Sequence, residues 1–356
     1  MQLKTQKILI VRLGAIGDVI RTLPALRALR HNLPDAYIAW VVEDRAASLL
    51  INHPDLNKVF VAPRKEWQKN PLSIKTLKEI IRLTKELRKE NFDLVLDFHG
   101  LFKSGLITFL TGVKDRVGYA RKFTKEGNFL FTNHHVPLTE HKINRVEKNL
   151  LLVKHLRLNI DEHNPIIPIS EKDREFVTST IFSQLTSSPG PKVIMHPGSS
   201  SSTPYKRWNF SRFAQLADRI IQKYGGTILF TAGNDEKELV DKIFKQMIES
   251  QHVLCQTETL TQLAEVIRQC DLFIGNDTAP MHLAAFVGTP VIALFGPTDP
   301  IENAPFGKGK AIVIRKDVSC SPCRTRECPN LLCMDAIAVK DVLEAVDLIL
   351  YRKGFN

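Results

Sequence analysis

Short, continuous apolar runs alternate with amphipathic segments in both halves of the chain. Residues 7–12 read KILIVR and residues 192–195 read KVIM. Each run is followed by a glycine-containing turn and then by a helical pattern, at 19–29 and at 210–224. Apolar strands that do not alternate with polar residues are typical of parallel sheets covered by helices on both faces. The pattern therefore predicts an α/β fold in each half.

Further apolar runs predict five more strands. They cover residues 37–42, 94–98, 227–231, 272–274 and 291–295. Pro165 and Pro168 interrupt the pattern between the two halves, and a loop at 187–191 precedes the first strand of the second half. The 356 residues suffice for two domains, which we expect at 1–168 and 169–338. Ligands of doubly wound sheets bind near the carboxyl ends of the strands, and we expect the active site there, in a cleft between the domains.

The charge is concentrated in the first half. The chain has 49 Lys and Arg against 38 Asp and Glu, and residues 1–165 hold 28 basic against 17 acidic residues, which is the whole excess of 11. This asymmetry predicts an anionic partner, which is nucleic acid, a membrane surface or a phosphorylated substrate, unless the charge serves solubility alone. No apolar run reaches the roughly 20 residues of a membrane span, and no signal-peptide cleavage site is evident, so we expect a cytoplasmic protein.

The turn after the first strand, at 14–18, reads GAIGD. Its two glycines allow a ligand to approach the backbone, and Asp18 falls at a helix amino terminus, where the helix dipole favours a carboxylate. From these residues alone, Asp18 serves as a helix cap more readily than as a catalyst. G-x-G-x-x-G and G-x-x-x-x-G-K-[ST] are both missing. Nicotinamide enzymes, for which Glu43 is the candidate ribose-binding acid, and P-loop kinases are therefore disfavoured.

Three segments of the second half offer groups for a nucleoside diphosphate. The loop at 196–202 reads HPGSSSS and is followed by Lys206, which suits a diphosphate cradle or, equally, a flexible polar loop. The segment 275–282, GNDTAPMH, begins a helix, whose amino terminus binds anions. Asp235 and Glu236 follow the strand at 227–231. They suit contacts to a ribose or, equally, a solvated turn. No aspartate has another two positions away, so we expect no metal at the diphosphate.

A cationic stripe is predicted on a helix of the first half. Its members are Lys75, Lys78, Arg82, Lys85 and Lys89, within an arc of about 80°. We expect the other side to be covered by Ile74, Leu77, Ile80, Ile81 and Leu87. Glu79 and Glu86 flank the stripe, which favours a solvated face over a binding face. Aromatic residues are not interleaved with the cations, so we expect no nucleic acid.

Four cysteines follow the spacing C-x2-C-x4-C-x4-C. They are Cys320, Cys323, Cys328 and Cys333. This spacing suits a zinc or iron–sulfur site, disulfides, or reduced thiols that brace a loop, the last being the default in the cytoplasm. Cys255 and Cys270 are expected in the core.

Five segments together resemble the ADP-heptose:lipopolysaccharide heptosyltransferases, glycosyltransferase family 9. They are ILIVRLGAIGDVIRTLPALRALR, DLVLDFHGLFKSG, MHPGSSSSTPYKRW, FIGNDTAPMHLAAFVGTPVIALFGPTDP and the cysteine-rich tail ending in AVKDVLEAV. The resemblance implies the GT-B fold, in which two Rossmann-like domains face each other, with a carboxyl-terminal helix at 339–356 returning toward the first. It implies a cytoplasmic, inverting glycosyltransferase without metal or cofactor, peripherally associated with the inner face of the inner membrane.

The same resemblance assigns roles to individual residues. Asp18 matches the catalytic base and Lys206 the lysine that contacts the donor phosphates. The remaining donor contacts are Gly17, Gly198, Ser199, Ser200, Glu236, Asp277, Thr278, Ala279 and His282. The acceptor contacts are Arg64, Lys65, Lys103 and Arg121. The implied partners are ADP-heptose, a Kdo-lipid A or heptosylated inner-core acceptor, and the anionic membrane surface.

Overall fold

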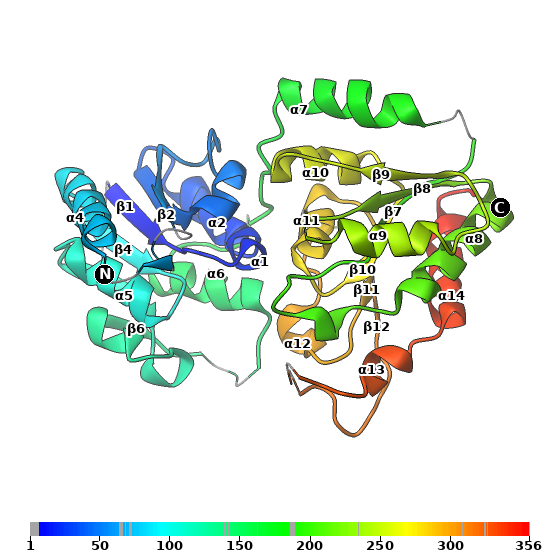
Figure 1. Ribbon diagram of the computed structural model, residues 1–356. Coiled ribbons are helices and arrows are strands. Elements are labelled where there is room, and N and C mark those ends of the chain that lie inside the picture. The colour runs from blue at the N-terminus through cyan, green and yellow to red at the C-terminus, as the bar shows by residue number, and fades with distance from the viewer. Residues whose placement is uncertain are drawn as a thin grey trace. The chain divides into compact units, whose positions relative to one another are not determined.

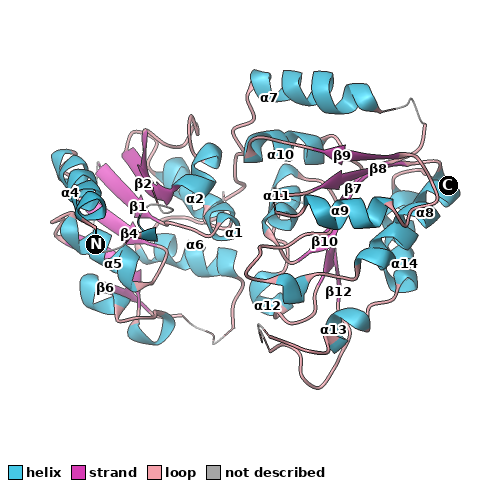
Figure 2. Cartoon of the chain, viewed as in Figure 1, coloured by secondary structure: helices cyan, strands magenta, loops and turns pink. Residues whose placement is uncertain are grey.

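The computed structural model describes most of the chain. The described residues are 7–63, 67, 69–70, 73–138, 140, 142–161, 163–185, 189–233, 235–307, 309–323, 325 and 327–355. The chain divides into two compact units, Met1–Pro168 and Ile169–Asn356. Each unit is a sheet with helices on its faces (Figure 1; Figure 2).

The first unit holds a six-stranded parallel sheet in the order β3-β2-β1-β4-β5-β6. Its strands are β1 (Lys7–Val11), β2 (Tyr37–Glu43), β3 (Lys58–Ala62), β4 (Leu94–Asp97), β5 (Asp115–Tyr119) and β6 (His134–Val136). Its α-helices are α1 (Ile16–Ile20), α2 (Leu23–Asn32), α4 (Ile74–Lys89), α5 (Phe102–Leu110) and α6 (Arg145–His155). Strand order reverses between β1 and β4, the place where doubly wound sheets bind ligands.

The second unit repeats this topology, with the order β12-β11-β10-β7-β8-β9. Its strands are β7 (Lys192–His196), β8 (Thr227–Thr231), β9 (His252–Cys255), β10 (Leu272–Asn276), β11 (Val291–Leu294) and β12 (Ala311–Ile314). Its helices are α7 (Glu171–Phe176), α8 (Phe210–Tyr224), α9 (Lys237–Phe244), α10 (Leu260–Arg268), α11 (Ala279–Val287), α12 (Pro300–Asn303), α13 (Leu332–Asp335) and α14 (Val339–Arg352). Read from β9, the order is that of the first unit, so the predicted pair of Rossmann-like sheets is confirmed.

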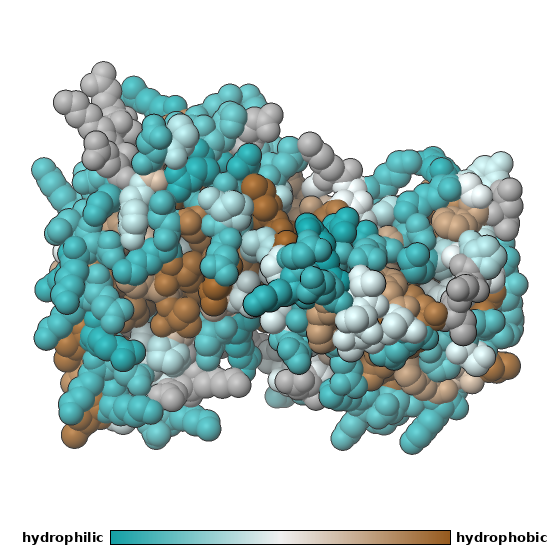
Figure 3. All heavy atoms as spheres, turned by 90° about the horizontal axis from the view of Figure 1, so that it is seen from above, coloured by the Kyte–Doolittle hydropathy of each residue, from teal (hydrophilic) through white to brown (hydrophobic). Residues whose placement is uncertain are grey.

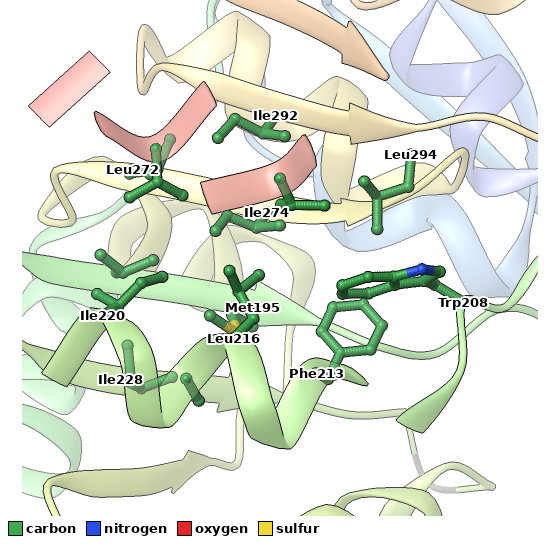
Figure 4. Packing of buried hydrophobic residues seen from close by; sticks show 14 of the residues in the cluster. Met195, Trp208, Phe213, Leu216, Ile220, Ile228, Leu272, Ile274, Ile292 and Leu294 are labelled. Atoms are coloured by element: carbon green, nitrogen blue, oxygen red, sulfur yellow. The ribbon is translucent and has the colours of Figure 1, made fainter. Parts of the chain in front are cut away.

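An apolar core joins α8 to the second sheet (Figure 4). Trp208 and Phe213 pack edge to face with ring centroids 5.0 Å apart, and both are buried. Trp208 also donates from its indole nitrogen to the Ile337 carbonyl (2.9 Å). The loop that precedes α8 is thereby anchored in the core, and this loop carries Lys206 at the end of a short 3₁₀ turn.

The expected helix at 19–29 is wrong in its extent. The structure places two helices there, α1 and α2, with a break at Arg21 and Thr22. Pro24 lies in the first turn of α2, where its missing N–H costs nothing, and it cannot continue a preceding helix. The helix expected at 210–224 is confirmed as α8.

Two other outcomes concern α4 and α14. The apolar residues of α4 lie outside the cationic stripe, as expected, but the helix turns Leu83 and Leu87 to the sheet and leaves Ile74, Leu77 and Ile81 exposed. Helix α14 packs on α8 and on strands β10 to β12 of its own unit. Its return toward the first unit stays a prediction. Among the described residues, no helix is long and apolar enough to span a membrane.

Candidate active site

Asp18 is surrounded by three arginines at the carboxyl edge of the first sheet. Its Oδ2 lies 2.6 Å from Nη2 of Arg12, and its Oδ1 lies 2.6 Å from Nη2 of Arg21 and 3.5 Å from Nη1 of Arg145. Burial by itself raises the pKa of Asp18, but these guanidinium groups outweigh it and hold the pKa far below its usual range. The carboxylate is therefore ionised at neutral pH.

The fold fixes this cluster from three directions. Arg12 directly follows β1, and its Nη1 donates to the Phe98 carbonyl after β4 (2.5 Å). Arg21 follows Asp18 by three residues, so both lie on one face of a helical turn, and its Nε donates to the Gly17 carbonyl (3.2 Å). Arg145 begins α6, which Asn144 caps by accepting from a backbone N–H in the first turn. Only Arg21 has a local sequence signal, and none of the three arginines was predicted from the sequence.

In the second unit, Lys206 and Asp277 form an ion pair at the start of α11. Nζ of Lys206 lies 2.8 Å from Oδ2 of Asp277 and 3.3 Å from its carbonyl oxygen. The His282 ring lies 3.9 Å from the other carboxylate oxygen of Asp277. The hydroxyl of Thr278 donates to the Asn276 carbonyl (3.3 Å) and does not cap the helix. Lys206 therefore lies beside the amino end of α11, whose first residue is Ala279. This combination suits an anionic ligand.

A second group of predicted residues surrounds Glu236. One of its carboxylate oxygens accepts from the Gly233 N–H (2.7 Å) and lies 3.8 Å from Nε2 of His196. Burial lowers the pKa of His196, although Glu236 opposes this, so the imidazole is neutral at pH 7. A Cβ on Gly198 would lie 2.2 Å from the Glu236 carboxyl carbon. Gly198 is therefore needed for this close approach.

The side chain of Asn276 connects the two loops that carry the predicted contacts to the donor substrate. This residue was not predicted from the sequence. Its Oδ1 accepts from the Trp208 N–H (3.0 Å), and its Nδ2 donates to the carbonyls of Pro197 (2.9 Å) and Gly198 (3.2 Å). It is fully buried. A single amide thereby sets the spacing between the loop after β7 and the end of β10, which carry the predicted phosphate contacts.

The two predicted serines make their hydrogen bonds within the loop. The Ser199 hydroxyl donates to the Thr203 carbonyl (2.7 Å) and accepts from Nε of Arg207 (3.1 Å). The Ser200 hydroxyl lies 3.1 Å from that of Ser202. The hydroxyl of Ser199 is thus buried inside the loop, whereas Ser200 is exposed.

The two predicted acceptor residues that the structure describes have different partners. Lys103 pairs with Glu43 through a 2.7 Å contact, and the Arg121 guanidinium lies 5.1 Å from the centre of the Phe129 ring. Arg64 and Lys65 lie outside the described residues. Asp97 accepts from Ser104 and from two backbone N–H groups of the loop before α5, which fixes the segment that carries Lys103.

The cysteine cluster lines a cavity of about 230 Å³ beside Tyr205. All four of its thiols are free, and only Cys333 is buried. Among the described residues, no three metal-ligating side chains are gathered in a metal-binding arrangement. Cys255 and Cys270 lie in the core as predicted, and burial raises the pKa of Cys255 to about 12.

Comparison with known proteins identifies the family. A model of glycosyltransferase family 9 (heptosyltransferase) matches residues 80–333, most of the chain. The chain belongs to this family. It is therefore a glycosyltransferase, and Lys206, Asp277 and the cysteine cluster all lie within the matched segment.

Similar proteins match along nearly their whole length. The lipooligosaccharide heptosyltransferase 2 of Campylobacter jejuni is 29% identical over 336 residues, which cover 92% of this chain and 93% of the relative. The family 9 structure from Veillonella parvula has a TM-score of 0.83 at 23% identity, with 99% of each chain covered. The structure of Escherichia coli ADP-heptose LPS heptosyltransferase II has a TM-score of 0.75 at 22% identity, covering 98% of this chain and 99% of that one. The expected GT-B fold class is confirmed.

Proposed function

We propose that this protein transfers heptose from ADP-heptose to the inner core of lipopolysaccharide, with inversion at the anomeric carbon and without a metal. The names of the C. jejuni and E. coli relatives support the donor and the acceptor class. The observation that carries the mechanism is the ionised carboxylate of Asp18, next to the switch point of the first sheet. Residues 1–168 would bind the acceptor and residues 169–338 the nucleotide sugar.

Asp18 is the general base of this proposal. One of its oxygens accepts the proton of the acceptor hydroxyl while that oxygen bonds to the anomeric carbon and the bond to the ADP oxygen breaks. A carboxylate with a low pKa is a weak base toward a free hydroxyl. The hydroxyl becomes strongly acidic as its lone pair enters the new bond, so the proton moves late in this step. Acceptor anions that compete for Arg12, Arg21 and Arg145 strengthen the base further, because they weaken its ion pairs.

The leaving diphosphate is stabilised by the second unit. Lys206 exchanges part of its ion pair with Asp277 for the phosphate oxygens, and the N–H groups at the start of α11 donate to them. Glu236, buried behind Gly198, takes the ribose or base of the nucleoside. Lysine and helix N–H groups supply the positive charge that a metal provides in other transferases. Lys103 and Arg121 serve as acceptor contacts.

The mass of the product tests the reaction. The enzyme is incubated with ADP-heptose and a defined Kdo-lipid A acceptor, and a gain of one heptose is expected. Asp18→Asn should retain ADP binding by calorimetry and lose turnover by about 10² to 10⁴, the usual value of a positioned proton transfer. Asp35→Asn, at an exposed aspartate of the same unit, is the matched control and should turn over normally. Normal turnover of Asp18→Asn removes the base from the scheme.

Two other functions make different predictions. A transferase of the same fold that uses another nucleotide sugar would prefer that donor in a panel of nucleotide sugars. A non-catalytic nucleotide-binding protein would bind ADP and show no transfer with any of them. The pairing of Lys206 with Asp277 beside a helix amino terminus supports a diphosphate site rather than a solvated loop. The ionised Asp18 supports catalysis over nucleotide binding alone.

We also propose that the protein works in the cytoplasm at the anionic inner face of the inner membrane. The excess of cations in the first half supports this, since anionic lipids attract basic surfaces. The lipid-linked acceptor is held in the same membrane, so attraction to the surface raises its local concentration.

A further inference from the structure

Helix α4 exposes three large apolar side chains on one stripe. Ile74, Leu77 and Ile81 are 74%, 58% and 45% exposed. Their spacing of three and four residues places them along a single ridge of the helix. Soluble proteins expose isolated apolar residues often, but an ordered row on one helix marks an interaction site. Figure 3 shows one face of the chain, where apolar patches lie among hydrophilic side chains.

Cations adjoin this ridge on its outward side. Five of them are exposed, namely Lys75, Lys78, Arg82, Lys85 and Lys89. At about 100° per residue, the ridge covers an arc of roughly 60° and the cations cover the next roughly 80°. The opposite side of the helix, with Leu83 and Leu87, is buried on the sheet. The outward half of α4 is therefore part apolar and part cationic.

The acidic residues of α4 leave this face positive. Glu79 accepts from the indole nitrogen of Trp67 (3.0 Å). Glu86 lies 3.8 Å from Nε of Arg82, and this pair is highly exposed and therefore weak. Ile74, Lys75, Lys78, Glu79 and Arg82 line a hollow of about 420 Å³. The hollow joins the end of the ridge to three cations, which suits a lipid phosphate.

We propose that α4 docks in the plane of an anionic lipid surface, with the ridge Ile74, Leu77 and Ile81 inserted at the acyl boundary and the neighbouring cations on the phosphates. Charge complementarity selects the lipid, because a purely ionic partner leaves the ridge in water and a purely apolar partner leaves the excess positive charge of the helix uncompensated. With 16 residues the helix is about 24 Å long, which suits an interfacial element. The inference rests on the proposed function, for which it names the membrane-contacting surface.

Vesicle sedimentation tests the ridge. The whole protein is mixed with vesicles of phosphatidylethanolamine and phosphatidylglycerol, and with phosphatidylcholine alone. We expect binding to the anionic vesicles that falls as salt rises. The variant Ile74→Ser/Leu77→Ser/Ile81→Ser should bind at least about tenfold more weakly at every salt concentration, because the apolar contribution is lost. Leu348→Ser/Tyr351→Ser, at exposed apolar positions of α14, should bind as wild type.

Removing cations from α4 measures the ionic contribution to vesicle binding. The variant Lys78→Gln/Lys85→Gln/Lys89→Gln should lose binding at low salt and show a weaker dependence on salt than wild type. In the variant Leu77→Trp, the fluorescence of the new indole should shift to the blue on anionic vesicles only. All of these substitutions are at exposed positions, so the fold is retained.

Three results would overturn the inference. They are unchanged vesicle binding by the triple-serine variant, equal binding to neutral vesicles, and loss of self-association in that variant, which would make the ridge a contact between copies. Transfer to a water-soluble, deacylated acceptor tests the transferase proposal independently of membrane binding. The triple-serine variant should transfer to it at the wild-type rate, whereas failure of the transferase proposal abolishes transfer in both proteins and leaves vesicle binding intact.

Discussion

Replacing Asp18 with asparagine should destabilise the first unit as well as remove the base. Arg12 and Arg21 are 8% and 9% exposed, and Asp18 is the anion that their Nη2 groups contact at 2.6 Å. Removing one partner of a buried ion pair costs about 3 to 5 kcal/mol. We expect about 3 kcal/mol, because the Asp18 side chain retains 19% exposure. For a domain of this size, that lowers the unfolding midpoint by about 6 to 12 °C.

A second substitution isolates the electrostatic part of this loss. The variant Arg12→Met/Asp18→Asn also removes one of the cations that lose their anion in Asp18→Asn, and an apolar side chain takes its place. Nε of Arg12 is buried without a hydrogen-bond partner, so its removal also relieves a desolvated group. The double variant should therefore unfold at a higher temperature than Asp18→Asn alone. Scanning calorimetry gives the midpoints, and a double-mutant cycle gives the coupling energy of the pair.

The pH dependence of stability tests the sign of the contribution that Asp18 makes to folding. The folded pKa of Asp18 lies below its unfolded value of 3.8, so its stabilisation is complete above that value and is lost as the pH falls toward the folded pKa. The difference between wild type and Asp18→Asn should be largest near pH 7 and shrink from about pH 4 downward. Equal midpoints at pH 7, or a difference that grows in acid, would refute the account of the cluster.

Three smaller changes test the donor unit. Gly198→Ala should weaken ADP binding at least about tenfold by calorimetry, because its Cβ displaces the Glu236 carboxylate; binding as tight as wild type contradicts the contact. Asn276→Ala should lower the free energy of unfolding by about 2 to 3 kcal/mol in urea, since the Trp208 N–H and the Pro197 carbonyl lose their partner; a change below about 0.5 kcal/mol counts against it. Lys206→Met should lower kcat by about 10² to 10³ in the product assay, and an unchanged kcat removes the lysine from the leaving-group site.

The fold was predictable because its signal is local and repeated. Both halves begin with a buried strand and a glycine turn, and continuous apolar runs specify parallel strands. Five strands were not predicted from the sequence, namely β3, β5, β6, β9 and β12, and all of them except β5 lie at a sheet edge. The residues of β6 read HHV, and β9 begins with a histidine, so neither has the apolar run that marks a central strand. Pairing with a neighbouring strand sets their conformation, and this is a tertiary effect.

The candidate site was predictable only as far as its residues carry a motif. Lys206 and Asp277 were assigned by resemblance, and the structure brings them to 2.8 Å across 71 positions of sequence. Arg145 reaches Asp18 across 127 positions, and no local pattern connects the two. The hydrogen-bond partners of the Asn276 amide are backbone atoms, which cannot be identified from residue types. Long-range polar contacts of this kind follow from the topology rather than from spacing.

The width of the apolar side of helix α4 carries information about function. Its apolar residues, with Leu83 included, extend over roughly half of the helical circumference, whereas a helix packed on a sheet buries a stripe of about 100°. The sheet accepts Leu83 and Leu87, which pack in one cluster with Phe92 and Val95, whereas Ile74, Leu77 and Ile81 stay exposed. Part of this wide apolar arc therefore faces another environment. Cations beside that part make an anionic lipid surface the environment that satisfies both kinds of side chain.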